Sequence, residues 1–251
     1  MDASEQRIDL LRALDPASYM AGSGLEPDPW QVDFLRSEQD ALLNCTRQGG
    51  KSTVTAALAA HTATYSEKSL TLLVSPSLRQ SGELFRKVKG IYRGGQYRQD
   101  VKNESALQLE LASGSRVVSL PGKPDTILGY SAVDLLVIDE ASRVPDELYY
   151  AVRPMLAVSG GRLVALSTPF GKRGWFFREW TEGGDKWLRF RVTADDCPRI
   201  TQKFLDGERA SMGDWWFRQE YYCEFVQALD SVFSHDHVMG AVTDEVEPLF
   251  S

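Results

Sequence analysis

Short, continuous apolar runs that end in polar residues, separated by segments with helical spacing, constrain the fold of this chain most. They include ALLNC (residues 41–45), LTLLVSP (70–76), DLLVIDEAS (134–142) and RLVALSTP (162–169). Such runs are typical of parallel strands that helices bury on both faces. They predict an α/β fold with a mostly parallel central sheet flanked by helices.

Two further patterns predict the surroundings of the sheet. Residues 107–122, LQLELASGSRVVSLPG, alternate between apolar and polar side chains on both sides of Gly114, which predicts a hairpin. Residues 28–37, DPWQVDFLRS, follow a loop rich in glycine and proline. Asp28 and Pro29 predict the cap and first turn of a helix there.

The amino-terminal segment predicts an amphipathic helix. Ile8, Leu11 and Leu14 share one helical face, and Pro16 ends the pattern. The segment is acidic and lacks the basic start and apolar run of a targeting signal. No stretch of the sequence approaches the roughly 18 apolar residues that a membrane span needs. We therefore expect neither a targeting signal nor a membrane anchor.

Composition narrows the class of protein. The chain has 251 residues, of which 43% are hydrophobic, and so it can bury a sizeable core. A net charge of -7 argues against a basic coat for wrapping nucleic acid but allows a local basic stripe. Cys45, Cys197 and Cys223 lack C-x-x-C spacing, which indicates neither a disulfide framework nor a zinc site and fits a reducing compartment.

Residues 44–53, NCTRQGGKST, predict a loop that binds phosphate. Gly50, Lys51 and Ser52 fit the pattern G-x-x-x-x-G-K-[ST], whereas Cys45 takes the place of the first glycine. That glycine only eases the turn out of the strand, so the departure is minor. An apolar strand precedes the loop and a long alanine-rich helix follows, which would place a helix amino terminus under an anion. The alternative is a glycine-rich turn with an ordinary surface lysine.

An acidic pair follows the third apolar run. Asp139 and Glu140 stand at the end of a buried strand, where carboxylates are costly unless they hold a metal or position water. We expect Asp139 to hold Mg²⁺ together with Ser52, and Glu140 to act as the general base for the attacking water. The alternative is that both carboxylates cap the next helix.

Taken in order, the motifs resemble the ATPase domain of the large terminase subunit of tailed bacteriophages and related viruses. PWQ (29–31) looks like the adenine-contacting Q motif, and CTRQGGKST (45–53) is similar to the family's modified phosphate loop. VIDEA (137–141) matches its adjoining Asp and Glu. STPFGKRGWFFREW (167–180) looks like the coupling motif and the segment after it, and FRQEYYCEF (217–225) resembles the end of the motor domain. The resemblance thus covers nearly the whole chain.

The resemblance implies a fold and a domain plan. It implies a P-loop NTPase of the additional-strand (ASCE) type, with a small lid subdomain. We expect residues 1–226 to form the ATPase domain, including the amino-terminal helical segment. Residues 227–251 would be a tail or linker toward a nuclease domain that is absent from this chain.

The resemblance also implies ATP and Mg²⁺ as ligands and assigns site residues. Gln31 would read the adenine edge with Trp30 near it, and Arg47 would sense or stabilise the γ-phosphate in cis as a second catalytic residue beside Glu140. The alternative for Arg47 is a solvated loop arginine. The expected nucleotide-binding residues are Trp30, Gln31, Arg47, Gln48, Gly49, Gly50, Lys51, Ser52 and Thr53.

Two hydroxyl residues are implied as the coupling motif. Ser167 and Thr168 end an apolar strand, where hydroxyls can change hydrogen-bond partners at little cost. They would report the state of the phosphate to the next elements. The alternative is simple capping before Pro169.

One departure from the family concerns an arginine that acts between subunits. Family members often carry Arg before the glycine upstream of the acidic pair, where this sequence has Leu128. Either Arg143, Arg116 or Arg79 acts in trans, or the subunit relies on Arg47. The sequence leaves this choice open.

A basic stripe at residues 84–99, LFRKVKGIYRGGQYRQ, is the leading candidate for contact with DNA. Contacts to phosphate are electrostatic and independent of sequence, so a local patch suffices. A solvated helix and loop is the alternative, and Lys172 with Arg173 forms a smaller second candidate. The candidate DNA-binding residues are Arg86, Lys87, Lys89, Arg93 and Arg98.

The implied function is a motor that couples ATP hydrolysis to translocation of double-stranded DNA into a procapsid. The implied partners are double-stranded DNA, the portal protein, the small terminase subunit and the nuclease domain. A homo-oligomeric ring would form on assembly, whereas the isolated domain would be monomeric. The motor would work in the cytoplasm of the infected bacterial host, transiently docked on the procapsid.

Two other functions compete with this one. A helicase-like or restriction-type DNA translocase shares these motifs, but it needs a second RecA-like domain for which 251 residues leave no room. A nucleotide-binding structural module without turnover is the third possibility, against which Lys51, Ser52 and the acidic pair speak. We expect no metal site at His235, Asp236 and His237 and no nuclease activity from this chain.

Overall fold

The computed structural model of the chain describes residues 3–95, 100–122, 127 and 129–227. Its strands are β1 (Ala41–Cys45), β2 (Leu70–Ser75), β3 (Val101–Glu104), β4 (Gln108–Leu111), β5 (Arg116–Pro121), β6 (Leu135–Asp139), β7 (Arg162–Ser167) and β8 (Leu188–Val192). Its helices are α1 (Ala3–Leu14), α2 (Pro16–Gly22), α3 (Pro29–Arg36), α4 (Lys51–Tyr65), α5 (Leu78–Gly94), α7 (Asp146–Val152), α8 (Gly174–Glu182) and α9 (Gln202–Tyr222). Short 3-10 turns lie at Ala141–Arg143, Arg153–Leu156, Gly184–Lys186 and Ala194–Asp196.

Among the described residues, the strands form an eight-stranded sheet in the order β3-β4-β5-β2-β6-β7-β1-β8. Only the β3–β4 and β4–β5 pairs are antiparallel, so the predicted mostly parallel sheet is confirmed. The predicted hairpin is also confirmed, with Gly114 in the turn between β4 and β5 at φ 85°. Strand β7 lies between β1 and β6, which is the additional-strand arrangement that the resemblance implies.

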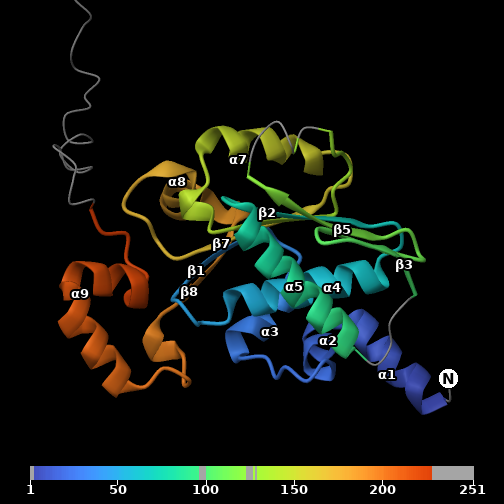
Figure 1. Cartoon of the computed structure of the whole chain (residues 1–251), viewed down its shortest axis with the longest axis horizontal. Coiled ribbons are helices and arrows are strands. Elements are labelled where there is room, and N and C mark those ends of the chain that lie inside the picture. Colours follow the sequence, from blue (N-terminus) through green and yellow to red (C-terminus); the bar gives the residue numbers. More distant parts are fainter. Residues whose placement is uncertain (1–2, 96–99, 123–126, 128, 228–251) are drawn as a thin grey trace, which may run out of the picture.

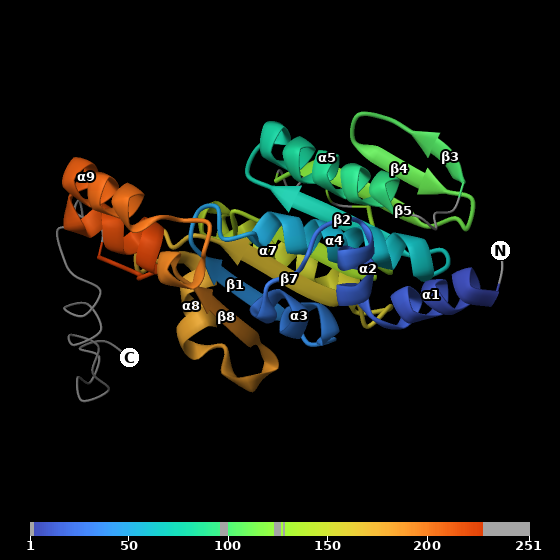
Figure 2. The ribbon, with the colours of Figure 1, turned by 90° about the horizontal axis from the view of Figure 1, so that it is seen from below.

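Helices cover both faces of the sheet (Figures 1 and 2). Figure 1 shows α7 and α8 on one face, with α3, α4 and α5 on the other. The apolar run of β6 contributes to the cores on both faces of the sheet. Leu135 and Val137 join the core beneath α4, whereas Leu136 and Ile138 join the core beneath α7 and α8. Each face of the strand is therefore buried, as parallel strands require.

Helix α4 is enclosed, which explains its composition. It packs against α2, α3 and α5 as well as the sheet, and Figure 2 shows it between α5 and α3. Small alanine side chains let the helix approach these neighbours closely. Ala56, Ala57, Ala59 and Ala60 are fully buried. The helix amino terminus is thereby held firmly at the carboxyl edge of the sheet.

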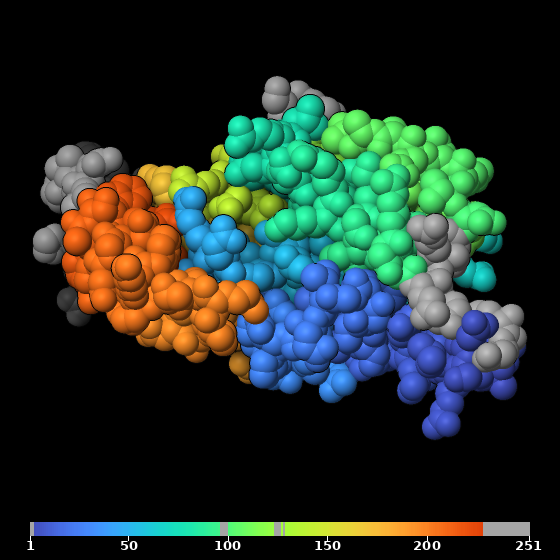
Figure 3. Space-filling model, turned by 60° about the horizontal axis from the view of Figure 1, so that its bottom comes forward, coloured from blue at the N-terminus to red at the C-terminus, as the bar shows by residue number. Residues whose placement is uncertain are grey.

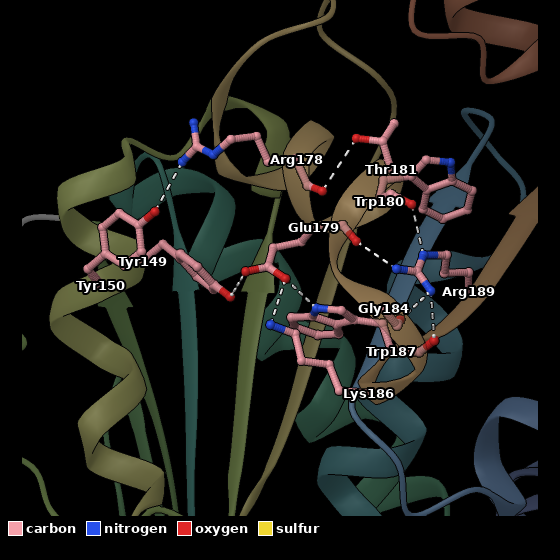
Figure 4. Close-up of polar contacts among 10 residues, drawn as sticks. All are labelled: Tyr149, Tyr150, Arg178, Glu179, Trp180, Thr181, Gly184, Lys186, Trp187 and Arg189. Atoms are coloured by element: carbon pink, nitrogen blue, oxygen red, sulfur yellow. Dashed lines mark hydrogen bonds and ion pairs between the residues drawn. The ribbon is translucent and has the colours of Figure 1, made fainter. Parts of the chain in front are cut away.

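Helix α8 is connected to α7 and to the segment just before β8 by a half-buried carboxylate (Figure 4). Glu179 accepts hydrogen bonds from the Tyr149 hydroxyl at 2.9 Å and from Trp187 Nε1 at 2.6 Å, and it pairs with Lys186 at 2.9 Å. Burial opposes ionisation, but these three partners together lower the pKa of Glu179. Arg189 donates to the backbone carbonyls of Glu179 and Trp180 in the same helix and to those of Gly184 and Trp187 in the segment after it. These contacts join α7, α8 and the segment leading into β8 on one face of the sheet.

The predicted amino-terminal helix is confirmed as α1, but none of its residues is buried. Leu11 is 55% exposed and Leu14 is 75% exposed. The helix attaches through polar contacts instead: the Tyr65 hydroxyl donates to Asp9 at 2.7 Å, and His61 bonds the carbonyl of Arg12 at 3.0 Å. None of the described helices is long and apolar enough to cross a membrane.

A small subdomain around α9 stands at one end of the sheet (Figure 1). It has its own core, in which Ala194, Leu205, Phe217 and Tyr221 pack together. Helix α9 breaks at Gly213, whose φ of 77° and ψ of 162° are not helical. We expect this subdomain to be the small lid that the resemblance implies.

Candidate nucleotide-binding site

The phosphate loop consists of residues 46–50, between β1 and α4, together with the first residues of α4. Its backbone turns through left-handed conformations at Gln48 (φ 62°) and Gly50 (φ 87°), and the Gly49 amide donates to the Thr46 carbonyl at 3.2 Å. Helix α4 begins directly after, at Lys51. The unpaired amide groups of a helix amino terminus bind anions well, so the loop has the geometry of a phosphate site.

Lys51 lies inside this loop. Its side chain is buried, and its Nζ lies 3.4 Å from the carbonyl oxygens of both Cys45 and Thr46. A buried ammonium needs anionic or carbonyl partners, and these two contacts are long. The ammonium is therefore placed to exchange them for phosphate oxygens.

Gly50 is required by the loop geometry, and its replacement by alanine gives a testable prediction. A Cβ there would lie 2.6 Å from Gln31 Nε2, and the left-handed φ adds a cost of about 1–2 kcal/mol. We expect Gly50→Ala to weaken ATP binding about tenfold, equivalent to about 1.4 kcal/mol, because the loop amides and Gln31 must shift. Fluorescence titration with a labelled ATP analogue measures this effect.

Gly160→Ala is the matched control for this prediction. Gly160 also has a positive φ (64°), but nothing lies within 4 Å of an added Cβ. Both variants should lose similar stability in thermal unfolding, whereas only Gly50→Ala should lose affinity. Equal affinities for the two variants would show that the loop at Gly50 does not shape the site.

A pocket of about 960 Å³ opens beside the loop. Figure 3 shows the hollow between the amino-terminal helices, α5 and the segment leading into α9. Apolar side chains of Met20, Leu25, Ile200 and Phe204 line one part of it. Of the predicted nucleotide-binding residues, those that line the pocket are Gln31, Arg47, Gln48, Gly50, Lys51, Ser52 and Thr53.

Of the two Q-motif residues expected near the base, Gln31 lines the pocket and Trp30 packs against the core. Gln31 Oε1 accepts a hydrogen bond from the Asp28 amide at 2.9 Å, and Gln31 Nε2 lies 3.5 Å from the Gly50 carbonyl. The predicted helix cap at Asp28 is confirmed. Trp30 is not among the pocket-lining residues, because its ring packs toward Phe190 with the centroids 6.1 Å apart. Arg199, which also lines the pocket, forms an ion pair with Asp28 at 2.7 Å.

The acidic pair lies at the same edge of the sheet as the phosphate loop. Strands β1 and β6 are parallel and separated by β7 alone, so their carboxyl ends are about 10 Å apart. Burial, and then the charge of Glu140, raises the pKa of Asp139 to about 6, whereas Lys51 lowers it. Lys51 and Asp139 are therefore within electrostatic reach of each other, although neither acid lines the pocket itself.

Glu140, the second residue of the acidic pair, has a strained backbone conformation. Glu140 has a φ of 51°, a left-handed conformation that costs a residue other than glycine about 1–3 kcal/mol. Its amide donates to Asp139 Oδ1 at 3.0 Å, which holds the two residues in a tight turn. Strain of this kind persists where it positions a functional side chain, and here it directs the chain away from β6 immediately after Asp139.

The oxygen groups present fit Mg²⁺. Ser52 supplies a hydroxyl and Asp139 a carboxylate, and both are hard oxygen ligands. No group of three His, Cys, Asp or Glu side chains suited to a metal occurs within the part of the chain that the structure describes. Mg²⁺ needs no such group, because it is usually held by one or two protein oxygens together with substrate phosphates and water.

The end of β7 contacts the acidic turn through Ser142. The hydroxyls of Ser142 and Ser167 are 2.6 Å apart, and the Ser142 hydroxyl donates to the Thr168 carbonyl at 2.8 Å. The Ser142 amide donates to Ser167 Oγ at 3.2 Å. Sequence reasoning missed Ser142, although its place two residues after Glu140 was a usable signal. Ser142 therefore joins the acidic turn to the carboxyl end of β7.

Arg47 lines the pocket, but its guanidinium pairs with a residue of α9. Its Nε donates to Glu220 Oε2 at 2.5 Å. That hydrogen bond raises the pKa of Arg47, and the charge of Glu140 adds to the effect. The guanidinium is thus within electrostatic reach of both carboxylates. No local pattern indicates the Glu220 contact, because 173 positions separate the two residues.

The basic stripe does not form one patch free of acids. Lys89 and Arg93 pair with Glu104 of β3, at 3.1 and 2.7 Å, and Arg86 pairs with Glu83. Lys87 points elsewhere: it lines the nucleotide pocket, and its charge lowers the pKa of Asp139, against the larger effects of burial and Glu140. Arg98 lies outside the described residues.

The candidate trans arginines lie apart from one another. Arg143 stacks on the Phe170 ring, 4.1 Å from its centroid, and shares that ring with Arg173, a candidate contact to DNA, at 4.3 Å. Arg79 is exposed at the start of α5, and Arg116 is exposed at the opposite edge of the sheet, where β5 begins. Leu128 and residues 234–238 lie outside the described part of the chain.

Comparison with known proteins identifies relatives of the chain. The sequence profile of the family described as "Terminase large subunit, T4likevirus-type, N-terminal" matches residues 42–238. The large terminase subunit of Escherichia phage T5 is 26% identical over 179 residues, which cover 66% of this chain and 40% of that protein. The chain therefore spans less than half of this relative's length.

Solved structures share the fold. The large terminase ATPase domain of Thermus phage P74-26 superposes with a TM-score of 0.73 at 22% identity, covering 82% of this chain and 97% of that one. A large terminase from a thermophilic bacteriophage, in complex with ATP-γ-S, has a TM-score of 0.62 at 16% identity, covering 86% of this chain and 52% of that one. These identities are low, so the likeness concerns the fold.

Proposed function

We propose that this chain, which belongs to the T4likevirus-type terminase large subunit family, binds and hydrolyses ATP with Mg²⁺ as the motor domain of a DNA-packaging machine. The observation that carries the proposal is the arrangement of three strand ends. β1 leads into the phosphate loop, β6 ends in the acidic pair, and β7 between them ends in the coupling hydroxyls. One triphosphate can reach all three ends.

The residues divide the chemistry of hydrolysis. Backbone amides of the phosphate loop and Lys51 would bind the phosphates, while Gln31 and the apolar wall of Ile200 and Phe204 would hold the base. Ser52 and Asp139 would hold Mg²⁺, which neutralises phosphate charge when bound. Glu140 would accept a proton from the attacking water. Arg47 would stabilise charge on the γ-phosphate.

The work coupled to hydrolysis is proposed to be translocation of double-stranded DNA into a procapsid. The proposal rests on family membership. Small terminase subunit, portal protein and a nuclease domain are the expected partners, in a homo-oligomeric ring that docks on the procapsid in the host cytoplasm. Lys172 and Arg173 beside the coupling motif, and the cations of α5, remain the candidate contacts to DNA.

Two alternatives are weaker. A structural module that only binds nucleotide would not need the strained Glu140 turn or the buried Asp139. The family profile that matches residues 42–238 is that of a terminase large subunit and not of a helicase or restriction translocase, which disfavours that alternative. The three-strand arrangement is best explained by turnover coupled to movement.

Phosphate release from ATP by the purified chain tests the function. We expect hydrolysis to require Mg²⁺ and to stop when a chelator is added. Without the ion, the oxygens of Ser52 and Asp139 cannot neutralise the phosphate charge. Duplex DNA should bind with an affinity that falls as salt rises, since backbone contacts release counterions. ATP binding without any hydrolysis, alone or with DNA, would instead favour the structural module.

A further inference from the structure

Lys87 lies at one edge of the buried face of α5. The residues of that face recur at helical spacing and include Leu84, Val88 and Ile91. At about 100° per residue, Lys87 flanks the buried face on one side and Lys89 flanks it on the other. Lys89 contacts Glu104 of β3, whereas Lys87 lines the nucleotide pocket. The two lysines of this helix therefore face different parts of the molecule.

The neighbouring cations of α5 are paired with carboxylates, and Lys87 is not. Lys89 and Arg93 share Glu104, and Arg86 also contacts a glutamate. Lys87 is exposed and forms neither a hydrogen bond nor an ion pair within the described residues. Its ammonium group is therefore available to a ligand without the loss of a protein contact.

The other cations that line the pocket already have protein partners. Lys51 contacts two loop carbonyls, Arg47 pairs with α9, and Arg199 pairs with the start of α3. Among the described lining residues, the carboxylate is that of Glu26, which is exposed. The lining is thus positively charged, and Lys87 adds an ammonium that no protein group neutralises. A cavity of this charge favours an anionic ligand.

The direction of α5 turns this side chain toward the phosphate loop. The helix begins at Leu78, shortly after β2 ends at Ser75, and β2 runs parallel to β6, β7 and β1. Side chains on a helix lean toward its amino terminus, so Lys87 leans toward the carboxyl edge of the sheet. Helix α5 forms one side of the hollow in Figure 3. At the same edge Lys87 lies within electrostatic reach of Asp139.

We propose that Lys87 contacts the outer phosphates of bound ATP from α5, as a second lysine beside that of the phosphate loop. A lysine ammonium binds phosphate as a point charge, and its flexible stem can move without any change in the fold. Mg²⁺ bridges the β- and γ-phosphates in such sites, so an ammonium near both the pocket and Asp139 can reach those phosphates. This inference rests on the proposed function and assigns Lys87 to the nucleotide instead of DNA.

Lys87→Met tests the contact, because it removes the charge and keeps the length of the side chain. The measured quantity is the affinity for a non-hydrolysable ATP analogue with Mg²⁺, by fluorescence titration. We expect the affinity to fall roughly five- to twentyfold, since a hydrogen bond to a charged group is lost. Inorganic tripolyphosphate with Mg²⁺ should displace the labelled analogue from the wild type. Its affinity should fall by a similar factor in the variant, because it offers phosphates without a base.

Lys102→Met is the matched control for the loss of one charge. Lys102 is an exposed lysine of β3 that pairs with Glu110 and does not line the pocket. This variant should bind the ATP analogue and tripolyphosphate like the wild type. Thermal unfolding of both variants confirms that the chain is folded.

Duplex DNA separates a nucleotide contact from a DNA contact. Without nucleotide, Lys87→Met should bind duplex DNA as tightly as the wild type does. Wild-type affinity of Lys87→Met for the ATP analogue, with or without a loss of DNA affinity, would overturn the inference. A loss for the analogue with no loss for tripolyphosphate would also overturn it, since the effect would then lie at the base. Failure of the wild type to bind the analogue would instead overturn the proposed function.

Discussion

Replacing Glu140 by glutamine is expected to lower ATP turnover by roughly a hundred- to ten-thousand-fold, the usual cost of removing a well-placed general base. Glutamine keeps the size and the hydrogen-bond acceptor but cannot take a proton from water. The tight turn that holds residue 140 depends on its own amide bonding Asp139, which the substitution leaves in place. Binding of ATP should therefore persist while single-turnover phosphate release becomes slow.

Glu147→Gln provides the comparison for this result. Glu147 is an exposed glutamate of α7, seven positions along the chain, and its replacement should turn over ATP like the wild type. Turnover by Glu140→Gln at the rate of this control would remove Glu140 from the mechanism. Loss of ATP binding by Glu140→Gln would mean that the residue shapes the site rather than activating water.

Replacing Lys51 by alanine is expected to weaken ATP binding by about ten- to a hundredfold. A hydrogen bond to a charged group contributes about 1.5–3 kcal/mol, and the buried ammonium has no other cation of the loop to replace it at that position. Lys87 and Arg199 line the wider pocket, but Lys51 alone lies inside the loop curve against the Cys45 and Thr46 carbonyls. Titration with the labelled ATP analogue measures the loss.

Lys102→Ala controls for the loss of one positive charge. Lys102 is a 65% exposed residue of the β3 strand, paired with Glu110 and outside the pocket. Its replacement should leave affinity unchanged. If Lys51→Ala and Lys102→Ala bound ATP equally well, the phosphate loop would not be the phosphate site.

Sequence patterns predicted the parts of the fold that depend on local chemistry. β1, β2, β6 and β7 are almost entirely buried, so their residues are mostly apolar and easily recognised. Strand β8 was missed because it is the edge strand beside β1, where LRFRV is only partly buried and carries two arginines. Strand β3 was missed for a similar reason, since all four of its residues are exposed.

The candidate site was predicted where its residues are close in sequence and missed where they are not. The phosphate loop and the acidic pair each occupy one short segment with fixed spacing. By contrast, Glu220, Arg199 and Lys87 reach the pocket region from distant elements, and their placement depends on how α9 and α5 pack. The pairing of Lys89 and Arg93 with Glu104 could not be predicted, because the sequence of a helix does not reveal that Glu104 faces it from β3.

A crystal structure of the chain with Mg²⁺ and a non-hydrolysable ATP analogue tests the central claim most directly. We predict one triphosphate in the pocket, with Lys51 Nζ within hydrogen-bond distance of a phosphate oxygen, Mg²⁺ contacting Ser52 on the side of Asp139, and Glu140 facing the γ-phosphate. An analogue bound elsewhere, with Lys51 still on the Cys45 and Thr46 carbonyls and the acidic pair lining a separate surface, would contradict it.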